Sequence, residues 1–170
     1  STSRGLGDVY KRQSIDSEGN TNLAVFSSIT HLGSNPAMIG FVLRPRTVPR
    51  NTYNNMFKLK YFTVNHINVH DIKDAHHTSA KYPKEISEFD QTNLEAEYLD
   101  GFIAPFVKSS KIKLACKYLN EYDIKENDTI LVVASIEGIY VDDGILQDDG
   151  WLRLDLAKTV AINGLDGYAE

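Results

Sequence analysis

Hydrogen-bonding side chains gather between Asn20 and Tyr53, in the run NTNLAVFSSITHLGSNPAMIGFVLRPRTVPRNTY. Small hydroxyl and amide residues alternate there with aliphatic and aromatic ones, so that one face can be buried while the other presents polar groups. The polar set comprises Asn22, Ser27, Ser28, Thr30, Ser34 and Asn35. A strand face with such polar groups suits the binding of a polar, planar ligand.

A second chemical feature ends this run, where Arg44 is followed by Arg50, Asn51 and Thr52. Asn51 or Thr52 can cap a short helix that begins there. Free N–H groups at a helix start, together with a guanidinium and a hydroxyl, form a good phosphate site. The same residue types also make an ordinary helix cap, so both interpretations stay open at this point.

Several enzyme signatures are missing from the sequence. GxGxxG, GxxxxGK[ST], HExxH, GxSxG and CxxC do not occur, which disfavours dinucleotide-fold, P-loop, zincin, hydrolase and dithiol interpretations. The five histidines lie between His31 and His77, but their spacing does not direct a ligand set to one ion. Asp142–Asp143 and Asp148–Asp149 each precede a glycine, as acidic turn residues do. We therefore predict no metal site.

Composition narrows the class of protein. The 170 residues, 42% of them hydrophobic, suffice for one domain with a sizeable core, and no apolar run approaches the roughly 18 residues of a membrane span. A net charge of -5, with scattered Lys and Arg, argues against a nucleic-acid-binding face. The single cysteine, Cys116, lies in the alternating run KIKLACKYL, which predicts a buried core thiol. One cysteine cannot form an internal disulfide, so we expect a reducing, cytoplasmic setting.

The first thirteen residues have a different character from the rest. Asp8 to Gln13 reads DVYKRQ, which is similar to the translated end of a transposon adapter used in sequencing libraries. We therefore interpret residues 1–13 as an assembly scar outside the fold, and residues 14–170 as a single domain.

The elements that must position these side chains are mainly strands. We expect strands at residues 22–30, 37–44, 61–67, 111–122, 129–141 and 145–146, with turns at residues 33–36 and 142–144. Short helices are expected to begin at residue 51 or 52 and to span residues 71–80, 87–97 and 154–162. Because a helix does not follow each strand, the pattern favours an antiparallel Greek-key barrel over a parallel doubly wound sheet.

Ordered motifs run along residues 18–170: NLAVFSS, SNP, GFVLRP, RNTY, YFTVNHI, HHTSAKYP with SEFD, APFV and DDGWLRLD. With these motifs the chain resembles the flavin reductase family of FMN-binding split barrels, which includes the flavoredoxins. The resemblance implies a mainly β protein with short helices, built as a Greek-key split β-barrel. It also implies a homodimer that holds FMN near the dimer interface, and electron transfer from NAD(P)H through the flavin to a flavin or protein acceptor.

The resemblance also implies which residues contact the cofactor. Those matching the first flavin-contacting strand and the turn after it are Asn22, Leu23, Ala24, Ser27, Ser28 and Asn35. Those matching the phosphate position are Arg44, Arg50, Asn51 and Thr52, where relatives commonly have Asp in place of Asn51. Those matching a segment that approaches the flavin from an insertion between strands are His77, Thr78 and Ser79.

The flavin ring itself would carry the chemistry, accepting hydride while the protein fixes the ring and leaves one face open. We therefore predict no catalytic acid, base or nucleophile. Three hypotheses remain: an NAD(P)H-dependent flavin reductase, a flavoredoxin-like FMN carrier without direct NAD(P)H use, and a non-enzymatic dimeric barrel module. Relatives have an early strand before the position of Asn20 and continue past that of Glu170, so we expect a chain truncated at both ends with an open barrel edge.

Overall fold

The computed structural model describes residues 10–15, 21–26, 28–43, 58–73, 93–158, 161–163 and 167–169. Within residues 10–15, 21–26, 161–163 and 167–169 it describes the backbone alone. Statements below refer to these residues.

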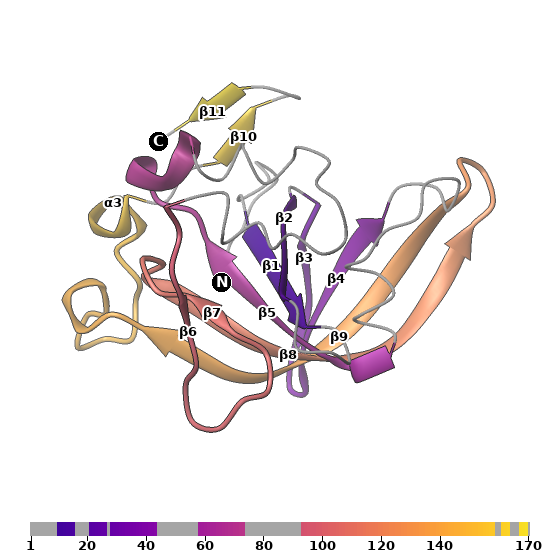
Figure 1. Ribbon diagram of the computed structural model, residues 1–170, viewed down its shortest axis with the longest axis horizontal. Coiled ribbons are helices and arrows are strands. Elements are labelled where there is room, and N and C mark those ends of the chain that lie inside the picture. The colour runs from indigo at the N-terminus through magenta and orange to yellow at the C-terminus, as the bar shows by residue number, and fades with distance from the viewer. Residues whose placement is uncertain are drawn as a thin grey trace.

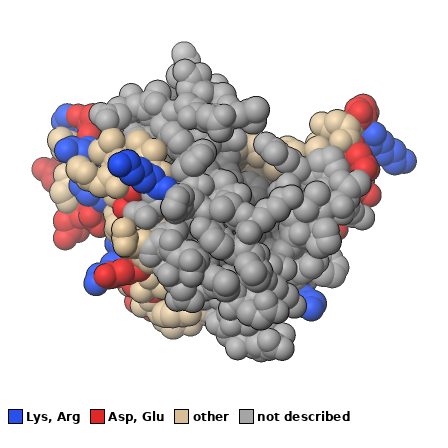
Figure 2. Space-filling view, turned by 45° about the horizontal axis from the view of Figure 1, so that its top comes forward, with Lys and Arg blue, Asp and Glu red and all other residues tan. Residues whose placement is uncertain are grey.

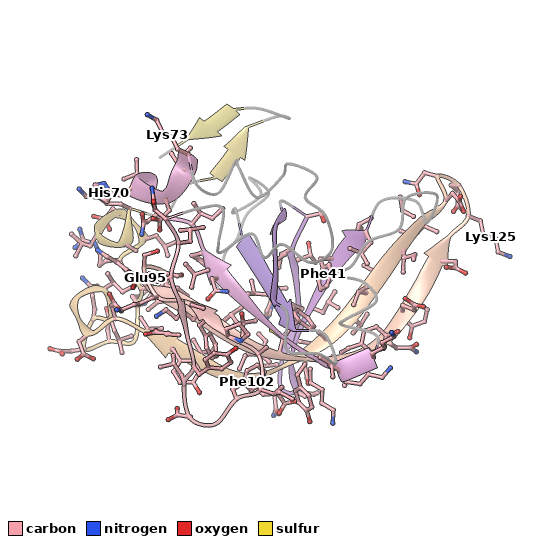
Figure 3. All side chains as sticks on the ribbon, in the orientation of Figure 1. Phe41, His70, Lys73, Glu95, Phe102 and Lys125 are labelled. Carbon is pink, nitrogen blue, oxygen red and sulfur yellow. The ribbon has the colours of Figure 1, made fainter. Side chains whose placement is uncertain are left out.

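Seven antiparallel strands form the main sheet, in the order β2-β1-β5-β8-β9-β4-β3 (Figure 1). Their bounds are β1 (Tyr10–Ile15), β2 (Thr21–Phe26), β3 (Thr30–Ser34), β4 (Ala37–Leu43), β5 (Tyr61–His66), β8 (Ile112–Ile124) and β9 (Thr129–Val141). β8 and β9 form a long hairpin that Figure 3 shows reaching away from the barrel to Lys125 at its tip.

The sheet curls so that its two outermost strands lie near each other, because they are neighbours in sequence. Phe26 ends β2 and Thr30 begins β3. Four residues of chain span at most about 14 Å, so the two ends of the strand order must lie close together. The seven strands therefore curl into a barrel, as the sequence predicts.

β1 corrects one expectation about the N-terminus. Tyr10 pairs with Phe26 of β2 on one side and with His66 of β5 on the other, and Gln13 pairs in the same way with Leu23 and Thr63. The prediction that residues up to 13 lie outside the fold is therefore wrong for residues 10–13, and a strand does precede Asn20. Ladder pairs use backbone groups, which do not depend on the origin of a segment, so the adapter interpretation itself stays a prediction.

The core consists of alternate residues of β4, β5, β8 and β9, which point into the barrel. Its buried members are Ile39, Phe41, Leu43, Phe62, Val64, Leu114, Cys116, Tyr118, Ile130, Val132 and Ala134. Phe41 and Phe62 meet edge to face, with ring centroids 5.7 Å apart. Cys116 is a buried free thiol, as predicted, and its pKa is raised by burial and, to a lesser extent, by the charge of Glu137.

Two predicted elements near the N-terminal half have different bounds. The strand expected at 22–30 is interrupted between β2 and β3, because the chain leaves one edge of the sheet and joins the other. The strand at 37–44 and the turn at 33–36 are confirmed by β4 and by the β3–β4 hairpin. Of the helix expected at 71–80, the structure describes a 3₁₀ helix, η1 (Val69–Asp71), and residues 74–80 lie outside the described residues.

Shorter elements occupy the C-terminal half. Of the helix expected at 87–97, Ala96–Glu97 is instead a strand, β6, paired with β7 (Phe106–Val107). In place of the strand at 145–146 lies a 3₁₀ helix, η2 (Asp143–Ile145). The helix at 154–162 is only α3 (Leu154–Ala157), because Lys158 takes a left-handed conformation with φ of 50° that ends it. Strands β10 (Ala161–Asn163) and β11 (Gly167–Ala169) then pair with each other.

Charged side chains of both signs lie on the described surface (Figure 2). Figure 2 shows described Lys and Arg side chains interspersed with Asp and Glu, without a continuous basic area among them. No helix within the described ranges is long and apolar enough to span a membrane.

Candidate functional site

The backbone of β2 carries the three residues predicted to contact the ring. Asn22, Leu23 and Ala24 pair with Ser14, Gln13 and Arg12 of β1. β2 is the last strand in the order of the described sheet, so one of its edges is not used by another strand of that sheet. A strand edge of this kind presents N–H and C=O groups that can hydrogen-bond the edge of a heteroaromatic ring.

Ser28 lies where the chain passes from β2 to β3, and its hydroxyl already has two partners. The Oγ donates to the carbonyl oxygen of Val42 at 3.2 Å and accepts from the Val42 N–H at 3.2 Å. A serine hydroxyl has one donor and two acceptor positions, so its only donor is engaged.

Asn35 occupies the turn of the β3–β4 hairpin, where it is exposed and precedes Pro36 through a cis peptide bond. The whole of β3 separates it from Ser28, which is roughly 20 Å of extended chain. The structure therefore does not bring these two predicted cofactor residues together.

The other predicted site residues lie outside the described residues. They are Ser27, Arg44, Arg50, Asn51, Thr52, His77, Thr78 and Ser79. Their roles stay predictions.

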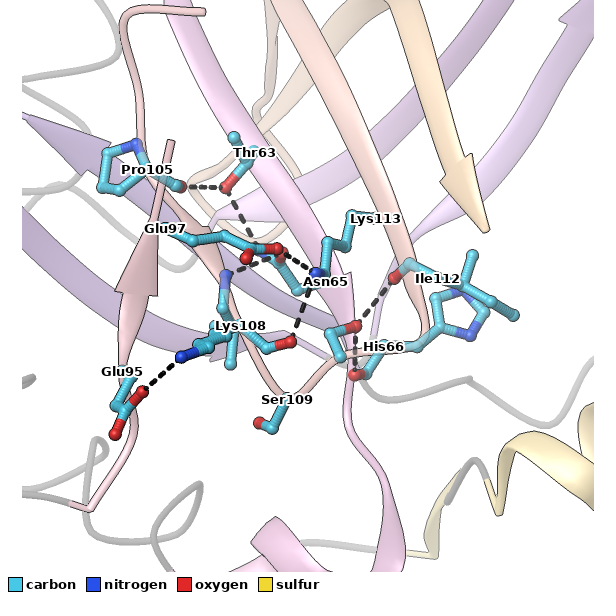
Figure 4. A network of polar contacts seen from close by, with 12 residues as sticks. Thr63, Asn65, His66, Glu95, Glu97, Pro105, Lys108, Ser109, Ile112 and Lys113 are labelled. Atoms are coloured by element: carbon cyan, nitrogen blue, oxygen red, sulfur yellow. Dashed lines mark hydrogen bonds and ion pairs between the residues drawn. The ribbon is translucent and has the colours of Figure 1, made fainter. Parts of the chain in front are cut away.

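Polar side chains that sequence reasoning did not single out fix the outer face of β5. Thr63 and Asn65 are fully buried there, on the face opposite to Phe62 and Val64. Thr63 Oγ1 donates to the carbonyl of Pro105 at 2.7 Å, and Asn65 Nδ2 donates to Thr63 Oγ1 at 3.1 Å (Figure 4). Asn65 Oδ1 also accepts from the N–H of Val107 at 3.0 Å. The strand is thereby tied to β7.

An ion pair ties the neighbouring strand β8 to the same segment. The Lys113 ammonium contacts the Glu97 carboxylate of β6 and also donates to the carbonyl of Lys108 at 3.2 Å (Figure 4). The Lys113 side chain is 9% exposed and that of Glu97 28%, so the pair is largely shielded from water. A second pair, Lys108 to Glu95 at 3.2 Å, is open to solvent.

Further hydrogen bonds join the two flanks of the predicted insertion. Asn68 Nδ2 donates to the carbonyl of Ser109 at 3.0 Å, and Ser109 Oγ donates to Asp71 Oδ2 at 2.6 Å. Ser110 Oγ donates to the carbonyl of His66 at 2.8 Å. Residues 66–71 before the insertion and residues 105–110 after it are therefore held against each other.

Aromatic rings complete this cover over the outer face. Successive centroids lie 5.8 Å apart from Tyr61 to Phe102, 5.7 Å from Phe102 to Phe106 and 5.2 Å from Phe106 to Tyr140. Desolvation raises the pKa of Tyr140, and a hydrogen bond with Asp100 raises it further. We call this region, made of Thr63, Asn65, Lys113 and Tyr140 with residues 93–110 above them, the covered half.

The remaining outer face, over β3, β4 and the distal β8–β9 hairpin, carries several apolar residues together with Thr30, Asn120 and Ser135, and we call it the open half. The register places Leu131 between Val42 and Tyr122, and Val133 beside Gly40. A Cβ on Gly40 would lie 3.1 Å from Leu32 Cδ1, so the glycine lets Leu32 pack onto the sheet. Leu32 and Tyr122 are 43% and 56% exposed.

The histidines in the described ranges do not form a metal site. Burial alone lowers the pKa of His66 to about 4, so its imidazole is neutral near pH 7, while His70 is exposed in η1. Among the residues that the structure describes, His, Cys, Asp and Glu nowhere gather in a group of three that could hold a metal ion.

Comparison with known proteins decides what this barrel belongs to. A family model described as "Flavin reductase like domain" matches residues 13–154. The chain belongs to the flavin reductase-like family. The resemblance seen in its motifs is thereby confirmed, and at this level the protein is a flavin-binding oxidoreductase.

Solved structures confirm the split barrel of this flavin reductase-like protein. A split-barrel protein of the flavin reductase type from Shewanella frigidimarina NCIMB 400 is 42% identical, with a TM-score of 0.92 over 97% of this chain and 82% of that one. Flavoredoxin of Desulfovibrio vulgaris (Miyazaki F) is 17% identical, with a TM-score of 0.83 over 99% and 89% of the two chains. An FMN-binding protein from Thermus thermophilus is 15% identical, with a TM-score of 0.79 over 98% and 87%. The last two share the fold.

Proposed function

We propose that this flavin reductase-like protein binds FMN and passes electrons from NADH or NADPH through it to a flavin or protein acceptor. The family match over residues 13–154 is the observation that carries the proposal, because it spans both the edge strand β2 and the barrel that supports it. The choice of FMN is supported by the structural neighbour from Thermus thermophilus that is named for binding it.

The described part of the site fits a flavin ring. Because successive residues of a strand direct their N–H and C=O groups to opposite edges, the unused edge of β2 offers backbone donors and acceptors at alternate residues of the stretch from Asn22 to Ala24. These can pair with the donor and acceptor edge of a pyrimidine-like ring. When bound, FMN supplies the hydride- and electron-transfer chemistry, and the residues of the chain bind it, orient it and keep water from it. Side chains proposed to complete the ring and ribityl contacts are Ser27, Asn35, His77 and Ser79.

For the phosphate we propose the basic run after β4, with Arg44, Arg50, Asn51 and Thr52 as ligands. Arg50→Ala is expected to weaken FMN binding by about 1.5 to 3 kcal/mol, the range for hydrogen bonds to charged groups. Riboflavin, which lacks the phosphate, serves as the control ligand, and its affinity should change little. An unchanged FMN affinity would place the phosphate elsewhere.

We further propose that two copies of the chain associate through the open half. Exposed apolar area can mark an interaction surface. Leu32 and Tyr122 are exposed, and Val42, Leu131 and Val133 beside them are partly exposed. A second copy offers the same apolar face, so that a two-fold arrangement would bury both.

Reduction by nicotinamide nucleotides tests the electron donor. FMN-loaded protein is mixed anaerobically with NADH or with NADPH while the visible flavin absorbance is followed. Bleaching at a rate that saturates with nucleotide is expected from at least one of them. Retention of tightly bound, unreduced FMN with both nucleotides would instead favour the flavoredoxin-like carrier, a function supported by the TM-score of 0.83 to flavoredoxin.

A further inference from the structure

We infer that Ser28 positions the cofactor-bearing strand, by fastening the joint between β2 and β3, and does not bind the FMN phosphate. The inference rests on the proposed function, since it concerns the strand on which the flavin would lie. It is drawn from the hydrogen bonds of the Ser28 hydroxyl and from the place of Ser28 in the sheet.

The joint lies where the β3–β4 ladder ends. Thr30 of β3 pairs with Gly40 of β4, and a continued ladder would set residue 28 opposite Val42. At that position the Ser28 side chain takes over the pairing, since its Oγ donates to the Val42 carbonyl and accepts from the Val42 N–H, both at 3.2 Å. One side chain thereby satisfies both backbone groups that a bending strand would otherwise leave unpaired.

The neighbouring residues show why this position controls β2. Ile29 packs against the barrel core, so the chain is anchored inward at the residue next to Ser28. Phe26, the last residue of β2, lies two positions before Ser28. A change in the direction of the backbone at Ser28 therefore changes the position of β2, the strand that carries Asn22–Ala24, because few residues separate the two.

Hydrogen-bonding capacity argues against a phosphate role. A flavin phosphate needs donors, and the single O–H of Ser28 is directed at the Val42 carbonyl. The remaining lone pair of Oγ can only accept a hydrogen bond. To donate a hydrogen bond to the phosphate, the Ser28 hydroxyl would have to give up its hydrogen bond to the Val42 carbonyl.

Three variants and two flavins test this role. Ser28→Ala removes the hydroxyl and Ser28→Thr keeps it. Ser135→Ala is a matched control, because the Ser135 hydroxyl on β9 donates to the Glu137 carboxylate two residues away, at 2.6 Å. Dissociation constants are measured for FMN and for riboflavin, and amide hydrogen exchange is measured at Val42 and at Phe41. Successive N–H groups of a strand point to opposite sides, so Phe41 reports on the β9 side of the same strand.

Ser28→Ala removes both hydrogen bonds to Val42. We expect it to weaken the binding of FMN and of riboflavin equally, by about three- to tenfold, an effect of the size of one ordinary hydrogen bond. Val42 should exchange faster while Phe41 does not, and Ser28→Thr should restore wild-type behaviour.

Three results would overturn the inference. Weaker FMN binding with unchanged riboflavin binding would make Ser28 a phosphate ligand. Unchanged Val42 exchange in Ser28→Ala would show that the hydroxyl does not hold the joint, and faster exchange without any change in affinity would show that the joint does not position the strand. If the unaltered protein bound neither flavin, the proposed function would fail by itself, whereas the Val42 exchange would still report on the joint.

Discussion

The two halves of the outer face of the sheet differ in the polarity of their side chains and in how far those side chains are buried. In the covered half, Thr63, Asn65 and Lys113 are polar and yet almost fully buried, because residues 93–110 supply a hydrogen-bonding partner for each. In the open half the outward residues include the apolar Leu32, Val42, Leu131 and Val133, together with a few polar ones such as Thr30 and Ser135, and Leu32 and Tyr122 are exposed. Buried polar groups must be paired, so the covered half is specific for one segment of its own chain, whereas the open half can receive a flat apolar partner.

This difference matters for the proposed site. The covered half fixes both flanks of the insertion that carries His77 and Ser79, through bonds such as Asn68 to Ser109. The open half adjoins the joint at Ser28, since Val42 belongs to both. One half thus fixes the described chain on both sides of a predicted cofactor segment, and the other places the strand joint beside a surface proposed for a second copy.

The largest effect on stability is expected from a cavity-creating substitution in the covered half. Phe106 is fully buried and contacts the rings of Phe102 and Tyr140. Phe106→Ala should lower the free energy of unfolding by about 3 to 5 kcal/mol, as large-to-small changes in packed sites do. Urea denaturation measures this, with Tyr98→Ala, 57% exposed on the same segment, as a control expected to change stability by less than about 0.5 kcal/mol. Equal effects for both variants would show that residues 93–110 do not pack as a cover.

A pH dependence should come from His66, at the edge of the covered half. Burial holds its pKa at about 4, whereas the unfolded chain takes up the proton near its ordinary value of 6.5. The contribution of the neutral His66 side chain to the free energy of unfolding is therefore fully present above about pH 6.5 and is lost as the pH falls toward 4. Between about pH 7.5 and pH 5 the loss amounts to about 2 kcal/mol.

His66→Gln should remove this part of the pH dependence of the free energy of unfolding, measured by urea denaturation at the two pH values. The readout is the difference between the two pH values, so a general destabilisation by the substitution does not affect it. A slope identical to that of the unaltered protein would contradict the burial of this imidazole.

The shielded ion pair should contribute more than its exposed neighbour. Lys113→Met leaves the Glu97 carboxylate without its ammonium partner and should cost about 1 to 2 kcal/mol, less than a fully buried pair because Glu97 can regain water. Lys108→Met, which breaks the pair with Glu95 at the surface, should cost less than about 0.5 kcal/mol. Chemical denaturation in low and high salt compares the two, and a larger effect at Lys108 would reverse the comparison.

The smallest effect on folding is expected in the open half. Tyr122→Glu changes a side chain that is 56% exposed, so the free energy of unfolding of a single chain should shift by less than about 0.5 kcal/mol. Burying two charges in an apolar interface is costly, so the same change should shift dimers to monomers in sedimentation velocity. Lys125→Glu at the hairpin tip is the control. An unchanged oligomeric state would exclude the open half as the interface.

Strands and core were predictable because their signals are local. Alternation along residues 37–44, 61–67 and 129–141 marks β4, β5 and β9 within a residue of their ends, and it placed Cys116 in the core. The helix expected at 154–162 failed because nothing in the run signals the left-handed Lys158 that ends α3. β1 was missed because residues up to 13 were excluded by their suspected origin, although pairing requires only the backbone.

The positioning residues were not predictable from residue type. Thr63 and Asn65 find their partners 42 residues away, in Pro105 and Val107, and no pattern in YFTVNHI identifies those partners. One signal was present: two polar residues alternate with buried apolar ones on that strand, which points to a polar cover. Ser28 was predicted as a cofactor contact from the family resemblance, and nothing in the sequence signals that its hydroxyl is engaged by the backbone of Val42.

The most direct test of the account is a titration of the protein with FMN, followed by the quenching of flavin fluorescence and by the flavin retained after dialysis. Saturable binding of one FMN per chain is expected, with riboflavin binding more weakly because the phosphate ligands then have no partner. A protein that stays colourless and takes up neither flavin would contradict it, and would leave the barrel as a module without a cofactor.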